Sequence, residues 1–340
     1  MVDSVKRMIQ AIGAKAADEV VEANAYAPSN IALAKYWGKR DLELNLPKNS
    51  SFSVSLGELG SHTHVAPGAD DDVVLLNGEE LQATDHFAEQ VLNFVGLFRG
   101  DKHLPLRIET RNTVPTAAGL ASSASGFAAL ISALNSALSL QLTKEQQSLC
   151  ARLGSGSATR SIWHGFVRWH RGNRDDGLDS HGVPLRDRWD DFRIAVLPID
   201  TGPKAQSSRD GMNHTVGTSP LYAAWPQQAE NDCNAIETAV KDQDMARLGP
   251  LCEANALAMH ATMLAARPAL RYLNAHSWQA LDTLGRARAE GLKAFATMDA
   301  GPNIKLIYLA ESSADVQSVF ADAQEINPFA QQVHLPNGFA

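Results

Sequence analysis

The chain has few cysteines, a shortage of cations and no long apolar run. Cys150, Cys233 and Cys252 lie far apart, so neither a disulfide framework nor a cysteine zinc site is expected. Lysine and arginine number 30 against 38 acidic residues, and the formal net charge of −8 argues against a general nucleic-acid binder. The most apolar stretch, 117–142, consists of small residues interrupted by Asn135 and predicts no membrane span.

The N-terminus also lacks the apolar core of a secretory signal. We therefore expect a cytoplasmic protein with neither nucleic acid nor a membrane as partner. Instead of a signal, Val5, Met8, Ile9 and Ile12 follow the spacing of one face of a short amphipathic helix. Residues 1–24 are interpreted as a helical N-terminal extension.

Strand-like and helix-like segments alternate irregularly, which favours an α+β fold over a doubly wound sheet. The 340 residues suffice for about two domains. Residues 171–191 are rich in Arg, Asp and Gly and are interpreted as an exposed connection. Placing the boundary near its end gives an N-terminal domain at 25–190 and a C-terminal domain at 191–340.

Local patterns predict individual elements. Residues 51–56 alternate polar and apolar, as in a half-buried strand, and Asn77-Gly78 predicts a type I′ hairpin between 73–76 and 79–81. Thr143 and Gln146 have the spacing of a capping box. Further strands are expected at 26–37, 104–110, 193–197, 295–298 and 303–309, and helices at 84–98 (capped by Thr84 or Asp85), 231–240, 244–264, 277–290 and 314–320.

A run of small residues at 115–124, Pro-Thr-Ala-Ala-Gly-Leu-Ala-Ser-Ser-Ala, precedes an alanine-rich helix. Unpaired N–H groups and the helix dipole favour phosphate at such a helix start, and the serine hydroxyls add donors or a magnesium ligand. A tightly packed turn has the same composition, and the Gly-Lys-Ser/Thr of a Walker loop is absent. The residues alone leave both interpretations open.

Three other segments carry polar groups suited to an anion. Ser155, Ser157 and Arg160 in 154–160 can converge on a carboxylate or phosphate, although a surface ion pair would also explain the arginine. Segment 35–40, Lys-Tyr-Trp-Gly-Lys-Arg, places three cations among aromatics with Lys48 nearby, unless these cations are simply solvated. Asp299 lies among turn residues at 298–303, so a purely structural role stays open.

Two histidine features are weaker. His62 and His64 point to the same side of a strand, but no third ligand is suitably spaced and no metal site is expected there. His260 falls within a helical pattern and is interpreted as a hydrogen-bonded histidine.

Together, the segments resemble one family. Segment 115–124 is similar to the phosphate-binding motif of the GHMP small-molecule kinases. Within that superfamily, Ala-Pro-Ser-Asn-Ile-Ala at 27–32, followed by segment 35–40, resembles diphosphomevalonate decarboxylase. The segments 154–160, 207–212 and 298–303 match the same family in the same order. The resemblance covers about 25–309 and leaves the first 24 residues outside.

The resemblance implies a GHMP kinase fold, with an N-terminal ribosomal-protein-S5-domain-2-like domain and a C-terminal ferredoxin-like domain. It also implies ATP-dependent conversion of mevalonate 5-diphosphate to isopentenyl diphosphate, by 3-phosphorylation followed by loss of phosphate and carbon dioxide. ATP and Mg²⁺ are the implied cofactors and a homodimer the implied assembly. A phosphomevalonate decarboxylase, a mevalonate 3-kinase-type enzyme and a non-catalytic homologue are the alternatives.

The family's motifs also imply roles for residues. Asp299 would lie at the substrate 3-hydroxyl, paired with Lys35, while Asn30 and Arg160 would lie beside the carboxylate. Ser123 completes this implied catalytic set and is also the candidate Mg²⁺ ligand. The implied substrate-binding residues are Tyr36, Lys39, Ser155, Ser157, Arg160, Ser208 and Arg209. The implied ATP-binding residues are Thr110, Pro115, Gly119, Leu120, Ala121, Ser122, Ser123 and Ala124.

Overall fold

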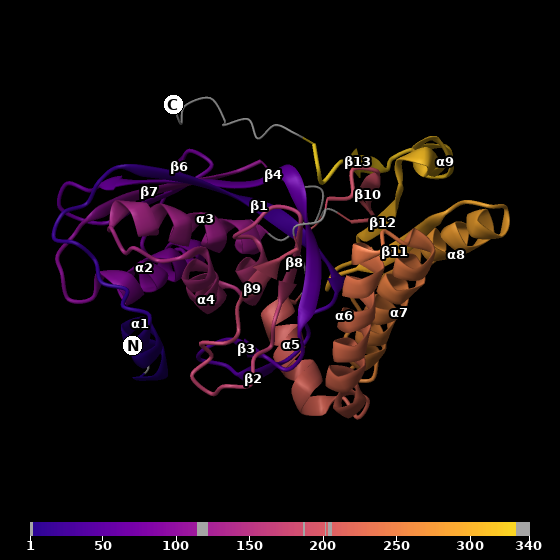
Figure 1. Cartoon of the computed structure of the whole chain (residues 1–340), viewed down its shortest axis with the longest axis horizontal. Helices are drawn as coiled ribbons and strands as arrows, with labels where there is room; N and C mark the ends of the chain where they lie inside the picture. The colour runs from indigo at the N-terminus through magenta and orange to yellow at the C-terminus, as the bar shows by residue number, and fades with distance from the viewer. Residues whose placement is uncertain (1–2, 114–121, 186–187, 201, 203–205, 331–340) are drawn as a thin grey trace.

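A computed structural model describes residues 3–113, 122–185, 188–200, 202 and 206–330. The described chain is organised around two larger β-sheets, one from each half of the sequence, with helices packed on and between them (Figure 1). None of the described helices is long and apolar enough to cross a membrane.

The N-terminal half contains a seven-stranded mixed sheet in the order β6-β5-β7-β4-β8-β9, with β1 also paired to β4. β4 is the longest strand, and its two ends pair with β8 and β7 respectively. The strands are β1 (Ala23–Ala34), β4 (Ser51–Pro67), β5 (Val73–Leu76), β6 (Glu79–Leu81), β7 (Leu106–Asn112), β8 (Phe166–Trp169) and β9 (Gly182–Pro184). A separate ribbon joins β2 (Lys39–Asp41) to β3 (Leu46–Pro47).

Helices cover one face of this sheet, where α3 packs on β1 and β4 (Figure 1). The α3 sequence is apolar on most sides, as expected of a helix enclosed by a sheet and other helices. The helices are α1 (Asp3–Ala11), α2 (His86–Arg99), α3 (Ser122–Ala137) and α4 (Lys144–Gly154), followed by the 3₁₀ helix η2 (Gly156–Arg160).

The C-terminal half contains an antiparallel sheet in the order β11-β12-β10-β13. Its strands are β10 (Phe192–Leu197), β11 (Ala294–Met298), β12 (Ile304–Leu309) and β13 (Gln324–Ile326). Its helices are α5 (Ser208–Thr218), α6 (Trp225–Lys241), α7 (Met245–Leu264), α8 (Ala275–Ala289) and α9 (Ser313–Val319), with 3₁₀ turns η3 (Tyr222–Ala224) and η4 (Ala310–Ser312).

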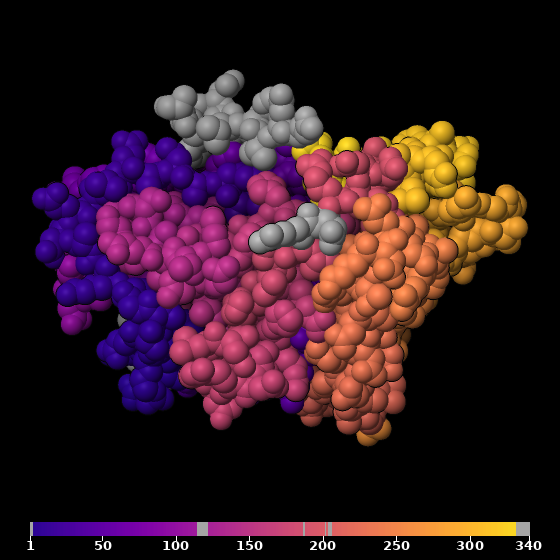
Figure 2. Space-filling model, viewed as in Figure 1, coloured from indigo at the N-terminus to yellow at the C-terminus, as the bar shows by residue number. Residues whose placement is uncertain are grey.

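The two halves share a hydrophobic core. α6 and α7 pack against each other and contact β1 of the N-terminal sheet, and α7 also packs on β11. Phe52, Phe166 and Phe192 join one buried cluster with Ile236 of α6. The space-filling view shows the two halves packed side by side (Figure 2). The position of one half is therefore fixed relative to the other.

Several local predictions are confirmed. Asn77 and Gly78 have φ angles of 54° and 88°, which the type I′ turn requires of both residues. Thr143 and Gln146 form the capping box. The helix after Asp85 begins at His86, but the Asp85 carboxylate accepts a hydrogen bond from the Gln82 N–H and does not cap the helix.

Other predictions are wrong in ways that tertiary packing explains. Residues 51–56 are buried on both faces, because the sheet is covered by N-terminal helices on one side and contacted by α6 on the other. Segment 171–191 is partly structural, since β9 joins the sheet and Ser180 is buried. The sequence patterns also missed β8, β13 and α5.

The fully buried Arg152 joins the N-terminal extension to the rest of this half. Its Nε donates to the Leu44 carbonyl (2.8 Å), its Nη1 to the carbonyls of Gly177 and Ser180, and its Nη2 lies 3.3 Å from the Met8 sulfur. Burial lowers the pKa of Arg152 to about 10, so the guanidinium stays charged at neutral pH. The extension is therefore part of the folded core.

Replacing Arg152 with Met should lower the free energy of unfolding by about 3 kcal/mol, because the buried carbonyls lose their donors. Denaturant unfolding measures the change. Arg286→Met, at an exposed position on α8, is the matched control and should leave stability nearly unchanged. Equal stability of the two variants would contradict the structural role of Arg152.

Candidate active site

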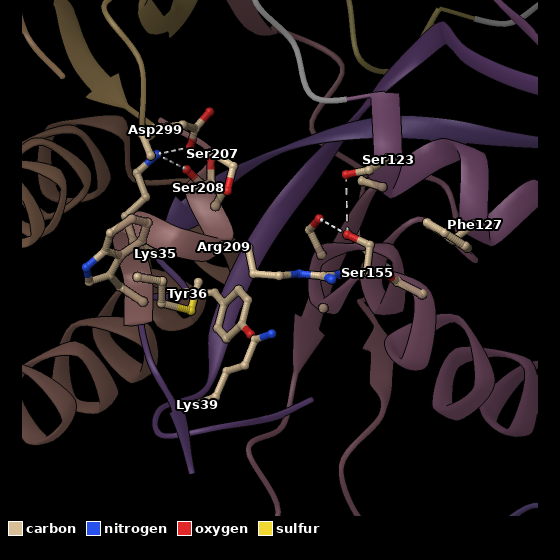
Figure 3. A pocket seen from close by; sticks show the side chains of 18 of the residues that line it. Lys35, Tyr36, Lys39, Ser123, Phe127, Ser155, Ser207, Ser208, Arg209 and Asp299 are labelled. Carbon is tan, nitrogen blue, oxygen red and sulfur yellow. Dashed lines mark hydrogen bonds and ion pairs between the residues drawn. The ribbon is translucent and has the colours of Figure 1, made fainter. Parts of the chain in front are cut away.

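A cavity of about 640 Å³ lies between the two halves. Five segments that are distant in sequence contribute to its wall: 27–32, 35–40, 154–160, 207–212 and 298–303. Figure 3 shows Lys35 and Asp299 at one side, Ser123 and Ser155 at the other, and Arg209 extending between them. Its polar lining from the predicted sets is Asn30, Lys35, Tyr36, Lys39, Ser123, Ser155, Ser157, Arg160, Ser208, Arg209 and Asp299.

Lys35 and Asp299 form an ion pair across the two halves, as the resemblance implies. Lys35 follows β1, is 2% exposed, and its Nζ lies 2.8 Å from Asp299 Oδ1 and donates to the Ala32 carbonyl. The Asn255 side chain of α7 accepts from the Lys35 N–H at 2.8 Å. Burial lowers the pKa of Lys35, and the Asp299 carboxylate partly opposes this change.

A second lysine, Lys305, contacts the other oxygen of Asp299 at 3.2 Å. Sequence reasoning missed it, although one lysine within the apolar run Ile-Lys-Leu-Ile at the start of β12 is a detectable signal. Burial alone would raise the pKa of Asp299, but the two ammonium groups hold it well below its usual range. Asp299 is therefore ionised at every physiological pH. We call Lys35, Asp299 and Lys305 the charge cluster.

His260 of α7 holds the backbone beside the charge cluster. Its Nε2 lies 3.1 Å from the Asp299 carbonyl, and since a carbonyl only accepts, this nitrogen carries the proton. Burial and the nearby Lys35 lower the pKa of His260 to about 4, so the imidazole is neutral at pH 7. The predicted hydrogen-bonded role of His260 is confirmed.

Arg160 is a buried cation without an ion pair to any carboxylate in the described part of the chain. Its guanidinium donates to Ser51 Oγ (2.6 Å) and to Asn30 Oδ1 (3.2 Å). Burial lowers the pKa of Arg160 to about 10, and the group remains protonated at neutral pH. Because a buried charge needs compensation, the arrangement suits a bound anion beside Arg160 and Asn30.

A second cationic region lies around Tyr36. The buried Tyr36 hydroxyl has no hydrogen-bond partner among the described residues. Lys39 Nζ donates to Asn45 Oδ1 at 2.6 Å, and burial, together with Arg209, lowers the pKa of Lys39 to about 8. Arg209 reaches from α5 to within 3.3 Å of the Gly154 carbonyl. These groups can together receive a polyanion.

The chain needs a glycine at position 156, because a Cβ there would lie 2.8 Å from the Tyr36 ring.

Three serine hydroxyls line the opposite side of the cavity. Ser123 Oγ, in the first turn of α3, lies 3.4 Å from Ser155 Oγ, which is 3.2 Å from Ser157 Oγ. We call the start of α3 together with these three hydroxyls the serine wall, and it can hydrogen-bond phosphate.

Some predicted residues lie elsewhere. Pro115, Gly119, Leu120 and Ala121 are outside the described residues. Thr110 is buried in β7, where its hydroxyl lies 3.0 Å from that of Thr63, and neither it nor Ser122 lines the cavity, whereas Ala124 does.

Only some of the cations predicted around 35–40 line the cavity. Arg40 is directed to the carbonyls of Arg171 and Arg174, and Lys48 lies over the Tyr222 ring, so neither lines the cavity. Arg40 belongs to β2, and Lys48 follows β3.

His62 and His64 are separate from the cavity. His64 contacts Glu22 at 2.8 Å, and His62 packs against the Tyr26 ring. The described residues contain no cluster of three metal-ligating side chains.

Comparison with known proteins places this site in a family. Residues 27–182 match the diphosphomevalonate decarboxylase-like N-terminal domain, and residues 194–335 match the mevalonate 5-diphosphate decarboxylase C-terminal domain. Diphosphomevalonate decarboxylase of Saccharomyces cerevisiae is 37% identical over 320 residues, covering 87% of this chain and 80% of the relative. That of Aspergillus fumigatus is 37% identical over 319 residues, covering 86% and 78%.

Solved structures agree. Mevalonate diphosphate decarboxylase of Staphylococcus aureus superposes with a TM-score of 0.85 at 36% identity, covering 91% of this chain and 96% of that chain. The Enterococcus faecalis enzyme gives a TM-score of 0.81 at 36% identity, covering 91% and 97%. The predicted α+β fold of GHMP kinase type is confirmed. The chain belongs to the diphosphomevalonate decarboxylase family.

Proposed function

We propose that this chain catalyses the ATP-dependent decarboxylation of mevalonate 5-diphosphate to isopentenyl diphosphate. The observation that carries the proposal is one cavity containing the charge cluster, the buried Arg160 and a serine wall at the start of α3. Among similar structures, a protein called MDDEF is in complex with MVAPP, AMPPCP and magnesium at 37% identity.

The diphosphate end of the substrate would bind at Tyr36, Lys39, Ser208 and Arg209. The Tyr36 hydroxyl is buried and available as a donor, and Lys39 and Arg209 supply positive charge. Charge-assisted hydrogen bonds of this kind contribute about 1.5–3 kcal/mol each. Ser155 and Ser157 of the serine wall would add neutral donors to the diphosphate.

The carboxylate end would bind beside Arg160 and Asn30. Ser51 and Asn30 already orient the guanidinium, while the Asn30 amide donates to Ser161 Oγ at 2.7 Å. A preorganised, desolvated cation stabilises an anion more than a solvated one does. Arg160 would thus hold the carboxylate in position until the C1–C2 bond breaks.

Asp299 would face the tertiary 3-hydroxyl. Since two lysines keep its pKa low, Asp299 is a weak base and a permanently charged acceptor. It would hold the hydroxyl hydrogen and so aim the oxygen at the phosphoryl group to be transferred. Once the 3-phosphate is in place, it leaves C3 as the C1–C2 electrons form the new double bond.

ATP and Mg²⁺ fit the serine wall. The Ser123 and Ser155 hydroxyls and the first turn of α3 present donors to phosphate. No acidic cluster for a metal occurs among the described residues, so Mg²⁺ would be held by phosphate oxygens and water, with Ser123 as a protein ligand. When bound, the ion supplies charge neutralisation for phosphoryl transfer.

We further propose a cytoplasmic homodimer with domains at 25–190 and 191–340. The three cysteines are buried and free, which suits a reducing compartment, and each half has its own sheet. The dimer rests on the family resemblance.

Purified protein with ATP and Mg²⁺ should release carbon dioxide from mevalonate 5-diphosphate and consume one ATP per turnover. The same assay with mevalonate 5-phosphate and mevalonate, with product identification, tests the alternatives. Turnover at an unchanged rate without nucleotide would contradict the proposal. A preference for the monophosphate would assign the chain to the phosphomevalonate decarboxylase alternative.

Asp299→Asn should lower kcat at least about 100-fold, because it keeps the side-chain size and removes the charge that orients the hydroxyl. KM for mevalonate 5-diphosphate should change little, since the substrate's anionic ends bind elsewhere. Asp282→Asn at an exposed position of α8 is the control. Near-normal kcat in a folded Asp299→Asn protein would leave Asp299 with a turn-forming role only.

The KM for mevalonate 5-diphosphate should rise as the pH increases through about 8. In the free protein Lys39 loses its proton near that pH, and the diphosphate then loses a cation. Lys39→Arg keeps a positive charge and should remove this alkaline rise. An identical alkaline rise in the wild type and in Lys39→Arg would assign the dependence to another group.

A further inference from the structure

Lys305 is a buried lysine that neither the motifs nor the sequence analysis single out. It is the second residue of β12 and its side chain is 3% exposed. Its ion pair within the described residues is with Asp299 Oδ2, at 3.2 Å. Because burying an ammonium group is costly without a partner, its position next to Asp299 calls for an explanation.

The strand register accounts for its position. Thr297 pairs with Lys305 and Met298 with Ile304, so the turn at 299–303 brings Lys305 back beside Asp299. Lys35 contacts Oδ1 and Lys305 contacts Oδ2. One lysine alone would leave the carboxylate free to rotate, whereas two lysines on different oxygens fix its plane.

Charged and titratable groups reach Asp299 from every element packed against it. Lys35 follows β1, Lys305 belongs to β12, and Arg160 of η2 acts on the same region through its charge. His260 of α7 is neutral and binds the Asp299 carbonyl. With both lysines protonated and Asp299 ionised, the charge cluster formally carries one excess positive charge, which favours anions at this end of the cavity.

We propose that Lys305 is a positioning residue for Asp299, fixing its second oxygen and giving the charge cluster its net positive charge. The proposal rests on the proposed function, in which Asp299 faces the reacting hydroxyl. A purely structural lysine would instead stabilise the 299–303 turn without affecting how the carboxylate works.

The test is Lys305→Met, which keeps the length of the side chain and removes its charge. Lys293→Met is the matched control, because Lys293 precedes β11 and is 74% exposed. We expect Lys305→Met to lower kcat by about tenfold or more while KM for mevalonate 5-diphosphate stays within about twofold. Thermal unfolding of both variants establishes that they are folded.

A double-mutant cycle separates positioning from structure. If Lys305 acts through Asp299, adding Lys305→Met to Asp299→Asn should cost little further activity. Because a neighbouring cation is lost, the pKa of Asp299 should rise, and kcat of Lys305→Met should fall at acidic pH values where the wild type keeps its activity. Additive losses with an acidic pH profile identical to that of the wild type would overturn the proposal.

A readout without turnover keeps this test distinct from that of the proposed function. Carbon-13 NMR of carboxyl-labelled aspartates, with the Asp299 signal identified by its absence in Asp299→Asn, reports the protonation of Asp299 directly. It should titrate at higher pH in Lys305→Met than in the wild type. An unshifted titration overturns the role of Lys305, whereas an inactive wild type with the expected shift overturns only the proposed reaction.

Discussion

The ion pair between Lys35 and Asp299 joins the two halves of the molecule and constrains everything around the cavity. Lys35 follows β1 of one sheet, and Asp299 follows β11 of the other. A buried ammonium group and a partly exposed carboxylate keep their geometry at such a junction only if they are paired and the backbone on each side is held in place. α7 satisfies that condition from between the sheets, because its Asn255 binds the Lys35 N–H and its His260 binds the Asp299 carbonyl. Displacing α7 would separate the charges, so helix packing and site geometry depend on each other.

The cavity is cationic in an acidic protein. Lys35, Lys39, Arg160 and Arg209 line it against Asp210 and Asp299, while the whole chain carries a formal charge of −8. Attraction of a polyanion is therefore a local property of this cavity and does not follow from the net charge of the chain. Burial strengthens each interaction, because Arg160 is desolvated and already oriented by Ser51 and Asn30.

The N-terminal extension is connected to the cavity wall through a series of contacts, although it precedes the residues that match the family. Met8 of α1 contacts the Arg152 guanidinium, and Asn45 donates to the carbonyls of Arg152 and Leu153. The same Asn45 accepts from Lys39 at the cavity wall. A continuous set of contacts thus runs from the extension to a substrate-facing lysine, which gives residues 3–11 a structural role in this fold.

The sequence by itself determined some of the local structures and most of the polar residues that line the cavity. The Asn77-Gly78 turn and the Thr143 capping box depend on neighbouring residues alone, and the motif residues were identifiable because their types and order resemble one family. Only the tertiary structure decided that Lys305 contacts Asp299, that Arg40 turns away, and that residues 51–56 are buried on both faces. The physical reason is that burial and charge pairing arise between distant segments, such as Lys35 and Asp299, which are 264 residues apart, and the partners are set by sheet register and helix packing.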